Sequence, residues 1–448
     1  MTRITDDELW QLAVTTLDRN RWRTPEGYRH TVPSRTLYPH QWSWDTGFIA
    51  VGLARVRPRR AWDDLRSLFA AQWADGRVPH IVFDQTERTH ERYFPGPQFW
   101  RSDRVPGAPA RATSGIVQPP VHALAAWEVY RRSPDPAARA HAAGELAWLY
   151  PRLVAQQHYL ARCRDIGGAG LASIVHPWES GQDNSPAWDP ALAAVPADTT
   201  LLDRYQRRDL LVSAEAHRPT DADYARYITI AQCYRSYGYV DDGPGGRYPF
   251  LVECPAFNAI MAGAEQALAE IAAVIGADPA PHRARAAQLT QLLADRLFDP
   301  VTGMFHARDV YTGALSPQRC LGGLVPLILP ELPAVQLKSL LAEAATPRFG
   351  LTERMRLPMP SYDRTAADLD PVRYWRGPIW VNLNWLIWRG LREHGQPALA
   401  AALRRSLLAV VRESGCYEYF HATTGAGVGT PAFSWTAALT LDLLPAGD

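Results

Sequence analysis

Cysteine is scarce in this chain of 448 residues, which holds only Cys163, Cys233, Cys254, Cys320 and Cys416. Their odd number and the absence of any CxxC pair predict neither a disulfide framework nor a zinc site, and favour a reducing compartment. The opening residues, MTRITDDELW, carry acids where a signal peptide carries basic and then apolar residues. No uninterrupted apolar stretch is long enough to span a bilayer. We therefore expect a cytoplasmic protein.

An excess of charge is also lacking, since the formal net charge is +1 and acidic and basic residues are interspersed. Without a basic run or an acidic tail, the chain has no feature typical of nucleic-acid or anionic-membrane binding. A hydrophobic content of 47% with 21% charged residues is that of a globular protein with a large core. No linker rich in glycine and serine divides the chain, so we expect residues 1–448 to form a single domain.

Strand signals are sparse, whereas apolar residues recur at helical spacing in about a dozen segments, mostly paired through short turns. The segments expected to be helical are 6–20, 45–55, 59–73, 121–132, 137–163, 221–239, 255–271, 281–297, 321–345, 378–394, 397–413 and 433–444. Pro151 is expected to kink one of these helices, and Pro330 and Pro333 to break another. A strand is expected at 78–83, and half of a hairpin at 305–311 across the turn at 299–303.

The strands do not alternate with the helices, which disfavours a βαβ sheet. Helical hairpins repeated about six times could instead close into an (α/α)6 barrel, with an open helical solenoid as the alternative. Long aromatic insertions at 76–120 and 164–220 favour closure, because they could cover one end of a barrel. We therefore predict an all-α (α/α)6 barrel with a loop-rich cap, and expect its segments 77–109 and 241–246 to move.

The rest of the chain is organised around residues 175–189, VHPWESGQDNSPAWD, which hold two tryptophans, three carboxylates and two prolines. Pro177, Gly181 and Pro186 interrupt any regular period, so the sequence predicts a loop held in one shape by its own turns. The plain interpretation is a surface loop in which Asp183 or Asn184 caps a helix. The functional one is an aromatic wall from which a carboxylate projects.

Tryptophan is unusually frequent, with 16 residues against 12 phenylalanines, and much of it lies in loops. Five segments pair aromatics with Gln, Arg, His or a carboxylate: YPHQWSWD at 38–45, GIVQPP at 115–120, HPWESGQDNS at 176–185, YWRGPIW at 374–380 and YEYFHATTG at 417–425. Aromatic faces suit the C–H patches of a sugar ring, and the polar groups suit its hydroxyls. With two opposed carboxylates, such a pocket can hydrolyse a glycosidic bond.

The residues alone leave the choice of the two carboxylates open. Glu179 and Asp183 compete in the 175–189 loop, where Glu179 could instead be a hydrogen-bonding partner that fixes the loop. Glu413 and Glu418 compete near the C-terminus, where Glu413 ends an amphipathic helix and is expected to be solvated. Glu418 lies between two tyrosines in a segment that should be sheltered, and a sheltered acid can have its pKa raised.

The segments HQWSWDTGF, HPWESGQDNS and YWRGPIWVNLNW, in this order, resemble glycoside hydrolase family 63 and its short bacterial branch of mannosylglycerate and glucosylglycerate hydrolases. The resemblance extends from about residue 38 to residue 435. It implies an (α/α)6 barrel with a cap and inverting hydrolysis, with Asp183 as general acid and Glu418 as general base. Inversion would place the two carboxyl groups roughly 6.5–9.5 Å apart, with a water between them.

The resemblance also implies substrate contacts. The residues implied for the sugar are Tyr38, Trp42, Trp44, Asp45, Trp178, Tyr374, Trp375 and Trp380. Those implied for the glycerate are Arg218, Tyr224, Gln118, His80 and Tyr93. A guanidinium binds a carboxylate through two parallel hydrogen bonds, which suits Arg218 to be the carboxylate receptor. The plain alternatives are an N-cap for Asp45 and core packing for Trp375 and Trp380, while His176 and His421 are expected to be structural.

We therefore predict hydrolysis of 2-O-α-D-glucosyl-D-glycerate to glucose and D-glycerate, with mannosylglycerate as the second substrate and a small-substrate α-glucosidase as the third choice. A non-catalytic carbohydrate-binding protein would need the aromatics without both carboxylates. A lyase or epimerase would need more pocket cations than Arg218. No cofactor, metal, nucleic acid or membrane partner is expected, and a homo-oligomer is compatible with the sequence.

Overall fold

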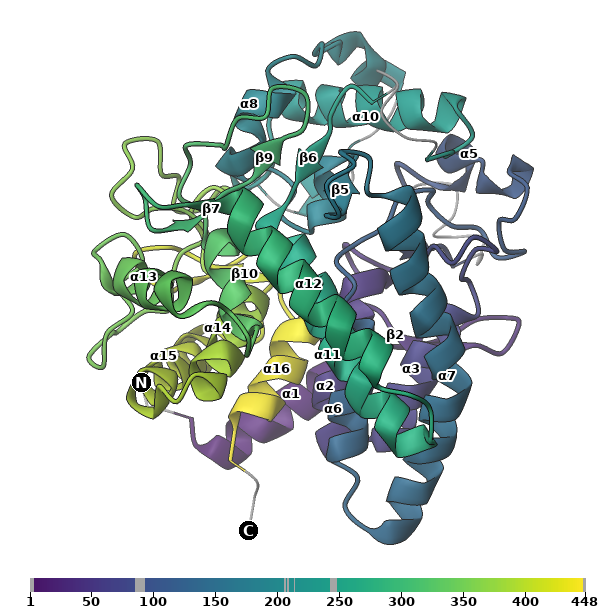
Figure 1. Ribbon diagram of the computed structural model, residues 1–448, viewed down its shortest axis with the longest axis vertical. Helices are drawn as coiled ribbons and strands as arrows, with labels where there is room; N and C mark the ends of the chain where they lie inside the picture. Colours follow the sequence, from purple (N-terminus) through teal and green to yellow (C-terminus); the bar gives the residue numbers. More distant parts are fainter. Residues whose placement is uncertain are drawn as a thin grey trace.

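Helices make up most of the computed structural model (Figure 1), which describes residues 4–84, 93–204, 207, 209–212, 214–241 and 248–445. The longer helices are α1 (Asp6–Arg19), α2 (Ser43–Val56), α3 (Pro58–Phe69), α6 (His122–Arg131), α7 (Pro136–Cys163), α10 (Asp221–Ser236), α11 (Pro255–Ile275), α12 (Ala280–Leu297), α13 (Ala334–Ala345), α14 (Val381–Glu393), α15 (Pro397–Ser414) and α16 (Ser434–Leu443). Single turns form α5 (Pro97–Trp100), α8 (Asp189–Leu192) and α9 (Asp209–Val212). The 3₁₀ helices are η1 (Ser102–Arg104), η2 (Pro177–Ser180), η3 (Pro186–Trp188), η4 (Thr199–Arg204), η5 (Glu215–His217) and η6 (Leu321–Ile328). The predicted predominance of helix is confirmed.

The strands of the described residues are only two or three residues long. They are β1 (Arg21–Arg23), β2 (Arg29–Thr31), β3 (Gln41–Trp42), β4 (Ile81–Val82), β5 (Ser173–Ile174), β6 (Val252–Glu253), β7 (Phe298–Asp299), β8 (Met304–Phe305), β9 (Arg308–Asp309), β10 (Tyr419–Phe420) and β11 (Gly427–Val428). All pairings are antiparallel, and β5, β6 and β9 form a three-stranded sheet in that order. Such short strands tie loops together rather than build a layer.

Packing contacts link six of the helices in a closed cycle. Along it, α2 contacts α6, α6 contacts α11, α11 contacts η6, η6 contacts α14, α14 contacts α16, and α16 contacts α2 again. A second set packs on the first: α1 on α16, α3 on α2, α7 on α6, α12 on α11, α13 on η6 and α15 on α14. Members of the two sets alternate along the chain. An open solenoid would lack the contact between α2 and α16 that returns the cycle to its start.

Helix α11 shows why the first set is central. By length and composition it could cross a membrane, but it is largely buried inside the protein. It packs against α6, α7 and α12, and its buried side chains join the continuous hydrophobic core. A helix that is apolar on nearly all sides is stable in water only when neighbouring helices surround it.

The differences from the predicted boundaries have local causes. Helix α14 begins at Val381 rather than near 378, because Ile379 pairs with Phe420 through two backbone hydrogen bonds of 2.7 and 2.9 Å. Helix α3 ends at Phe69 and α10 at Ser236, before the predicted 73 and 239. Helix α7 runs unbroken through Pro151. The predicted hairpin across the turn at 299–303 is confirmed, since β7 pairs with β8 and Phe298 lies opposite Phe305. Its second strand is shorter than the predicted 305–311, because β9 pairs with β6 instead.

Irregular segments gather at one end of the helical body. The short helices α5 and α8, helix α10 and the sheet of β5, β6 and β9 lie together at the upper end of Figure 1. Except for β9, which follows α12, they belong to the long stretches that follow α3 and α7, which contain the predicted insertions at 76–120 and 164–220. The predicted moving segments include residues 85–92 and 242–246, which lie outside the described residues.

Candidate active site

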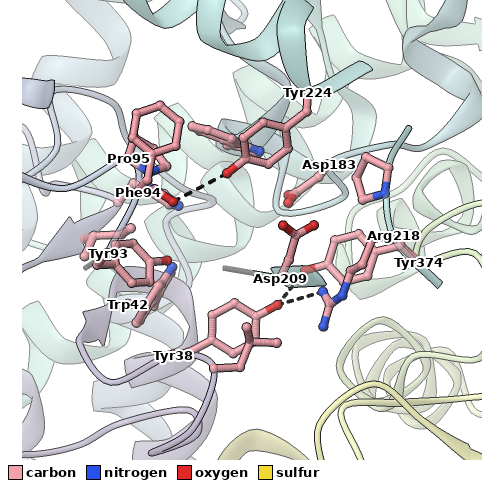
Figure 2. Close-up of a pocket in the computed structure, with 15 residues that line it drawn as sticks. Tyr38, Trp42, Tyr93, Phe94, Pro95, Asp183, Asp209, Arg218, Tyr224 and Tyr374 are labelled. Carbon is pink, nitrogen blue, oxygen red and sulfur yellow. Dashed lines mark hydrogen bonds between the residues drawn. The ribbon is translucent and has the colours of Figure 1, made fainter. Parts of the chain in front are cut away.

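A pocket with an empty volume of about 640 Å³ opens where these irregular segments meet the helices. The lining residues are Leu37, Tyr38, Trp42, His80, Ile81, Tyr93, Phe94, Pro95, Trp178, Asp183, Asp209, Arg218, Pro219, Tyr224 and Tyr374. Figure 2 shows aromatic rings on one side and the carboxylates, Arg218 and Tyr374 on the other. Nine predicted site residues therefore line one pocket, although they come from segments far apart in the chain.

Asp183 lines the pocket from the 175–189 loop, where its side chain is half-buried. The loop is held by its own turns, as predicted: Ser180 Oγ accepts the N–H of Gln182 at 2.9 Å, and Trp188 donates to the carbonyl of Gln182 at 2.7 Å. The N-cap of η3 is Ser185, so the plain interpretation of Asp183 or Asn184 as a cap is wrong.

The surroundings of Asp183 raise the pKa of its carboxyl group from 3.8 to about 7. Burial is the main cause, and the charges of Glu418 and Asp209 add to it, while Arg218 acts in the opposite direction. A group with this pKa is partly protonated near neutral pH, which is the state that proton donation requires.

Glu418 lies beside the pocket, with only 1% of its surface exposed. Its carboxylate accepts hydrogen bonds from the Tyr38 hydroxyl at 2.8 Å, from Arg218 Nη2 at 3.0 Å and from the backbone N–H of Thr430 at 3.2 Å. These donors fix the direction in which its oxygens point. Glu413, the competing residue, is exposed at the end of α15.

Arg218 is buried in the pocket wall. Besides Glu418, its guanidinium donates to the Tyr38 hydroxyl at 3.0 Å and lies over the Tyr374 ring at 4.8 Å. Tyr374 has a φ of 41°, a left-handed backbone conformation that side chains rarely adopt outside constrained sites. A ligand carboxylate would therefore meet a guanidinium already paired with Glu418, a pairing that the sequence did not predict.

Asp45 is the third residue of α2, whose N-cap is Trp42, so its interpretation as an N-cap is wrong. It is buried, and its pKa lies well above the usual range. Desolvation is the main cause, and repulsion by Glu418 and Asp183 adds to it. The charges of both carboxylates therefore act on Asp45, which indicates that these three acids from distant segments lie close to one another.

Four predicted site residues are absent from the pocket lining and lie behind it: Trp44, Gln118, Trp375 and Trp380. Trp375 and Trp380 stack with their ring centres 3.9 Å apart, and Trp380 Nε1 donates to the backbone carbonyl of Tyr374 at 2.9 Å. Gln118 accepts the backbone N–H of Trp44 at 3.1 Å. These four residues support the wall from behind.

Gly181 brings the loop against the Trp44 indole. Its φ is +68°, and a Cβ added there would lie 2.4 Å from the indole ring. Glycine is therefore required both for the left-handed backbone and for the close approach. The contact seats the Asp183 loop on the N-terminal turn of α2.

Aromatic and neutral groups form the other end of the pocket. The His80 ring stacks on Trp178 with centres 6.3 Å apart, and burial lowers the pKa of His80 to about 3, so the ring is neutral. Trp42 and Tyr93 meet edge to face at 5.9 Å, and the Tyr224 hydroxyl donates to the carbonyl of Phe94 at 3.5 Å.

The two histidines expected to be structural also have local partners: His176 Nδ1 accepts the N–H of Trp178, and His421 Nδ1 accepts the N–H of Thr423.

Asp209 is a pocket carboxylate that the sequence analysis missed. It belongs to α9 and is held by Arg207 through contacts of 3.2 Å from Nε and 2.7 Å from Nη2. The surrounding sequence, RRDLLV, has no motif that distinguishes it from a solvated charge pair. Within the described residues, no group of three or more His, Cys, Asp or Glu is placed to hold a metal ion.

Comparison with known proteins gives a consistent result. The model of the mannosylglycerate hydrolase MGH1-like glycoside hydrolase domain matches residues 38–436. A mannosylglycerate hydrolase of Rubrobacter radiotolerans is 40% identical over 420 residues, 93% of this chain and 93% of the relative. A glucosylglycerate hydrolase of Mycolicibacterium hassiacum is 35% identical over 427 residues, 92% of this chain and 94% of the relative.

A solved structure extends the similarity to the fold. The crystal structure of a family 63 mannosylglycerate hydrolase from Thermus thermophilus, in complex with Tris and D-glycerate, matches with a TM-score of 0.85 and 38% identity. The match covers 97% of this chain and 99% of that one. Fold, pocket and relatives together define a glycoside hydrolase. The chain belongs to the MGH1-like mannosylglycerate and glucosylglycerate hydrolases of glycoside hydrolase family 63.

Proposed function

We propose that the enzyme hydrolyses the α-glycosidic bond of a 2-O-glycosyl-D-glycerate with inversion at the anomeric carbon. Asp183 protonates the glycosidic oxygen as glycerate leaves. Glu418 takes a proton from the water that attacks the opposite face of the sugar. In this mechanism the two carboxyl groups stand roughly 6.5–9.5 Å apart, because the water lies between one of them and the ring.

One observation carries this assignment: a single pocket gives two carboxyl groups different surroundings. Burial raises the pKa of Asp183 to about 7, which suits proton donation near neutrality. Glu418 instead accepts donors from Tyr38, Arg218 and Thr430, which orient it as an acceptor. Groups whose environments differ in this way are the usual basis for separate acid and base roles.

The choice between the two sugars depends on the orientation of one hydroxyl. The glucosyl substrate is the first choice predicted from the sequence, but the relative named a mannosylglycerate hydrolase is 40% identical and the one named a glucosylglycerate hydrolase is 35% identical. We therefore take 2-O-α-D-mannosyl-D-glycerate as the first substrate and the glucosyl compound as the second. Asp45 is proposed to bind a sugar hydroxyl, and the effect of both Asp183 and Glu418 on its pKa supports a position near the two candidate catalytic groups.

The glycerate is proposed to lie toward Arg218, the cationic side chain in the pocket lining. Tyr224, Tyr93 and His80 line the pocket with it and supply hydroxyl and ring contacts. Bound glycerate in the Thermus thermophilus enzyme supports a receptor for this group in the family. Because Arg218 also pairs with Glu418, loss of Arg218 should reduce both kcat and affinity for the substrate.

We further propose that the single domain is an (α/α)6 barrel, with residues 76–120 and 164–220 as its cap. The closed cycle of six helices and the second set packed on it support the barrel. The position of α5 and α8, which belong to these two ranges, at one end of the helical body supports the cap (Figure 1).

A product assay tests the function. Mannosylglycerate and glucosylglycerate are supplied side by side to the wild type, to Asp183→Ala and to Glu418→Ala, and released sugar is followed by time-resolved NMR. We expect the β-anomer to appear first and both variants to lose turnover while still binding the substrate. First release of the α-anomer would refute inversion, and unchanged turnover in either variant would refute its catalytic role.

A further inference from the structure

Glu179 lies four residues before Asp183 in the same loop and is fully buried. Its carboxylate receives a forked ion pair from Arg164, with Nη1 at 2.6 Å from Oε2 and Nη2 at 2.7 Å from Oε1. Each oxygen also accepts a backbone N–H, from Val175 at 2.8 Å and from Val117 at 3.1 Å. Four donors thus fix Glu179, and one of them belongs to the separate segment that leads to Gln118.

Arg164 is itself held from behind by Asp241. Its Nε donates to Asp241 Oδ2 at 3.1 Å, and the hydroxyls of Tyr159 and Tyr234 donate to the same carboxylate at 2.5 and 2.6 Å. Arg77 approaches Asp241 at 3.5 Å. The four charged side chains are all at most 3% exposed, and their two positive and two negative charges balance.

Arg77 carries the network into the chain that follows α3. Its Nη1 donates to the carbonyl of Gly115 at 2.7 Å, and its Nη2 to the carbonyl of Tyr239 at 2.7 Å. Gly115 begins the GIVQPP segment, and Tyr239 follows α10. The network therefore joins the end of α7, the Asp183 loop and both predicted cap insertions.

Burial of four charges is an inefficient way to stabilise a protein, since the desolvation of each charge offsets much of the attraction. Such a network is nevertheless geometrically strict, because each donor must meet its acceptor. Replacing Glu179 by glutamine would keep the shape but turn one acceptor atom into an NH₂ donor. That donor would face an arginine N–H and a backbone N–H, so the loop would have to move.

Little chain separates Glu179 from Asp183 to absorb such a movement. Gly181 is pressed on the Trp44 indole, and the Tyr227 hydroxyl donates to the backbone carbonyl of Asp183 at 3.1 Å. A shift at Glu179 should therefore reach the Asp183 side chain. A displacement on the order of 1 Å can reduce a catalysed rate about 100-fold.

We propose that Glu179, gripped by Arg164, is a positioning residue that aims Asp183 at the leaving oxygen of the substrate. This inference rests on the proposed function, in which Asp183 is the general acid. Glu179 does not touch the substrate, and acts through the loop. Its loss should harm the steps that need proton donation more than those that do not.

The leaving group separates these effects. Glycerate departs as an alcohol and needs a proton, whereas fluoride departs from an α-glycosyl fluoride as an anion and needs none from the enzyme. The ratio of kcat on the glycosylglycerate to kcat on the α-fluoride of the same sugar is measured for wild type, Glu179→Gln and Asp183→Asn. We expect this ratio to fall about 10–100-fold in Glu179→Gln and further in Asp183→Asn, with little change in KM for the fluoride.

The matched control is Glu128→Gln, which removes a buried carboxylate on α6, away from the pocket lining. Glu128 pairs with Arg132, which directly follows α6, and with Arg389 on α14. It should change stability and leave the kcat ratio at the wild-type value. Should Glu179→Gln fail to fold, Arg164→Lys keeps the charge, removes the fork and should lower the ratio less.

The outcomes separate this inference from the proposed function. Equal losses on both substrates in Glu179→Gln and Arg164→Lys, with a selective loss in Asp183→Asn, would overturn the positioning role and leave the function intact. Equal losses on both substrates in Asp183→Asn would overturn the general acid itself. A selective loss in all three variants supports both.

Discussion

Asp183→Asn should make the enzyme more stable at pH 8 while removing most of its activity on glycosylglycerates. Burial raises the pKa of Asp183 from 3.8 to about 7, so the folded protein resists ionisation of this group by about 3 pKa units more than the unfolded chain. At about 1.4 kcal/mol per unit, the upper bound is about 4 kcal/mol. Because the side chain is half-buried and faces a pocket that water can enter, screening reduces this to about 2–4 kcal/mol.

The sign follows from the direction of the shift. Below about pH 4 the carboxyl group is protonated in both states, so the neutral amide brings no advantage. Between about pH 4 and pH 7 the unfolded chain releases the proton and the folded protein retains it, so the wild type loses stability relative to the variant. Above about pH 7 both states are ionised, and the advantage of the variant is complete.

Calorimetric melting at pH 4 and pH 8 measures this difference. With an unfolding entropy of roughly 2 cal/mol/K per residue, about 1 kcal/mol corresponds to about 1 °C in a chain of this length, so Tm should rise by roughly 2–4 °C at pH 8. At pH 4, close to the unfolded pKa of 3.8, Tm should rise by less than about 1 °C. Asp103→Asn, at an exposed site on η1, is the matched control. An equal gain in Tm at both pH values, or a loss of Tm at pH 8, would refute the reasoning. The turnover of Asp183→Asn on glycosylglycerates should fall by about 1,000-fold.

Three further substitutions test separate contacts. Tyr38→Phe removes one of the donors to the candidate base and should lower kcat about 10–100-fold. A hydrogen bond to a charged group contributes about 1.5–3 kcal/mol, so Tm should fall by no more than about 3 °C. An unchanged kcat would contradict this role. Asp209→Asn removes a negative neighbour that raises the pKa of Asp183, so the alkaline limb of the kcat/KM profile should move to lower pH, and a limb that stays in place would exclude this coupling. Gly181→Ala combines a left-handed backbone with a Cβ only 2.4 Å from a buried indole and should lower the free energy of unfolding by about 2–4 kcal/mol in denaturant titrations. Gly168→Ala, at a φ of +66° with open space around the added Cβ, is its control and should lose less.

The helices could be predicted from the sequence because apolar spacing reports local burial. Helix boundaries were less predictable where the backbone near the pocket pairs with a distant segment instead of continuing a helix. The turn before α14 is extended because Ile379 pairs with Phe420, a contact between segments that no local pattern contains. The second strand of the predicted hairpin was drawn too long for the same reason, since β9 pairs with the distant β6.

The pocket was predicted through resemblance more than through residue chemistry. Motifs identified Asp183 and Glu418, whereas the residues alone left Glu179 and Glu413 as competitors. The ion pair between Arg218 and Glu418 joins residues 200 positions apart and could not be inferred from either segment. Asp209 was missed because a carboxylate beside an arginine is ordinarily solvated. Its place in the pocket lining depends on the tertiary fold, which the local sequence does not show.

Helix α16 closes the cycle of helices through its contacts with the early helices α1 and α2. Ser434, at the start of α16, donates to the carbonyl of Val32 at 2.7 Å and accepts from Asn20 at 2.9 Å. A nascent chain that has not yet released this helix from the ribosome leaves the apolar flank of α2 uncovered and the Glu418 segment unanchored. The Glu418 side of the pocket therefore becomes ordered only after α16 has packed on α1 and α2.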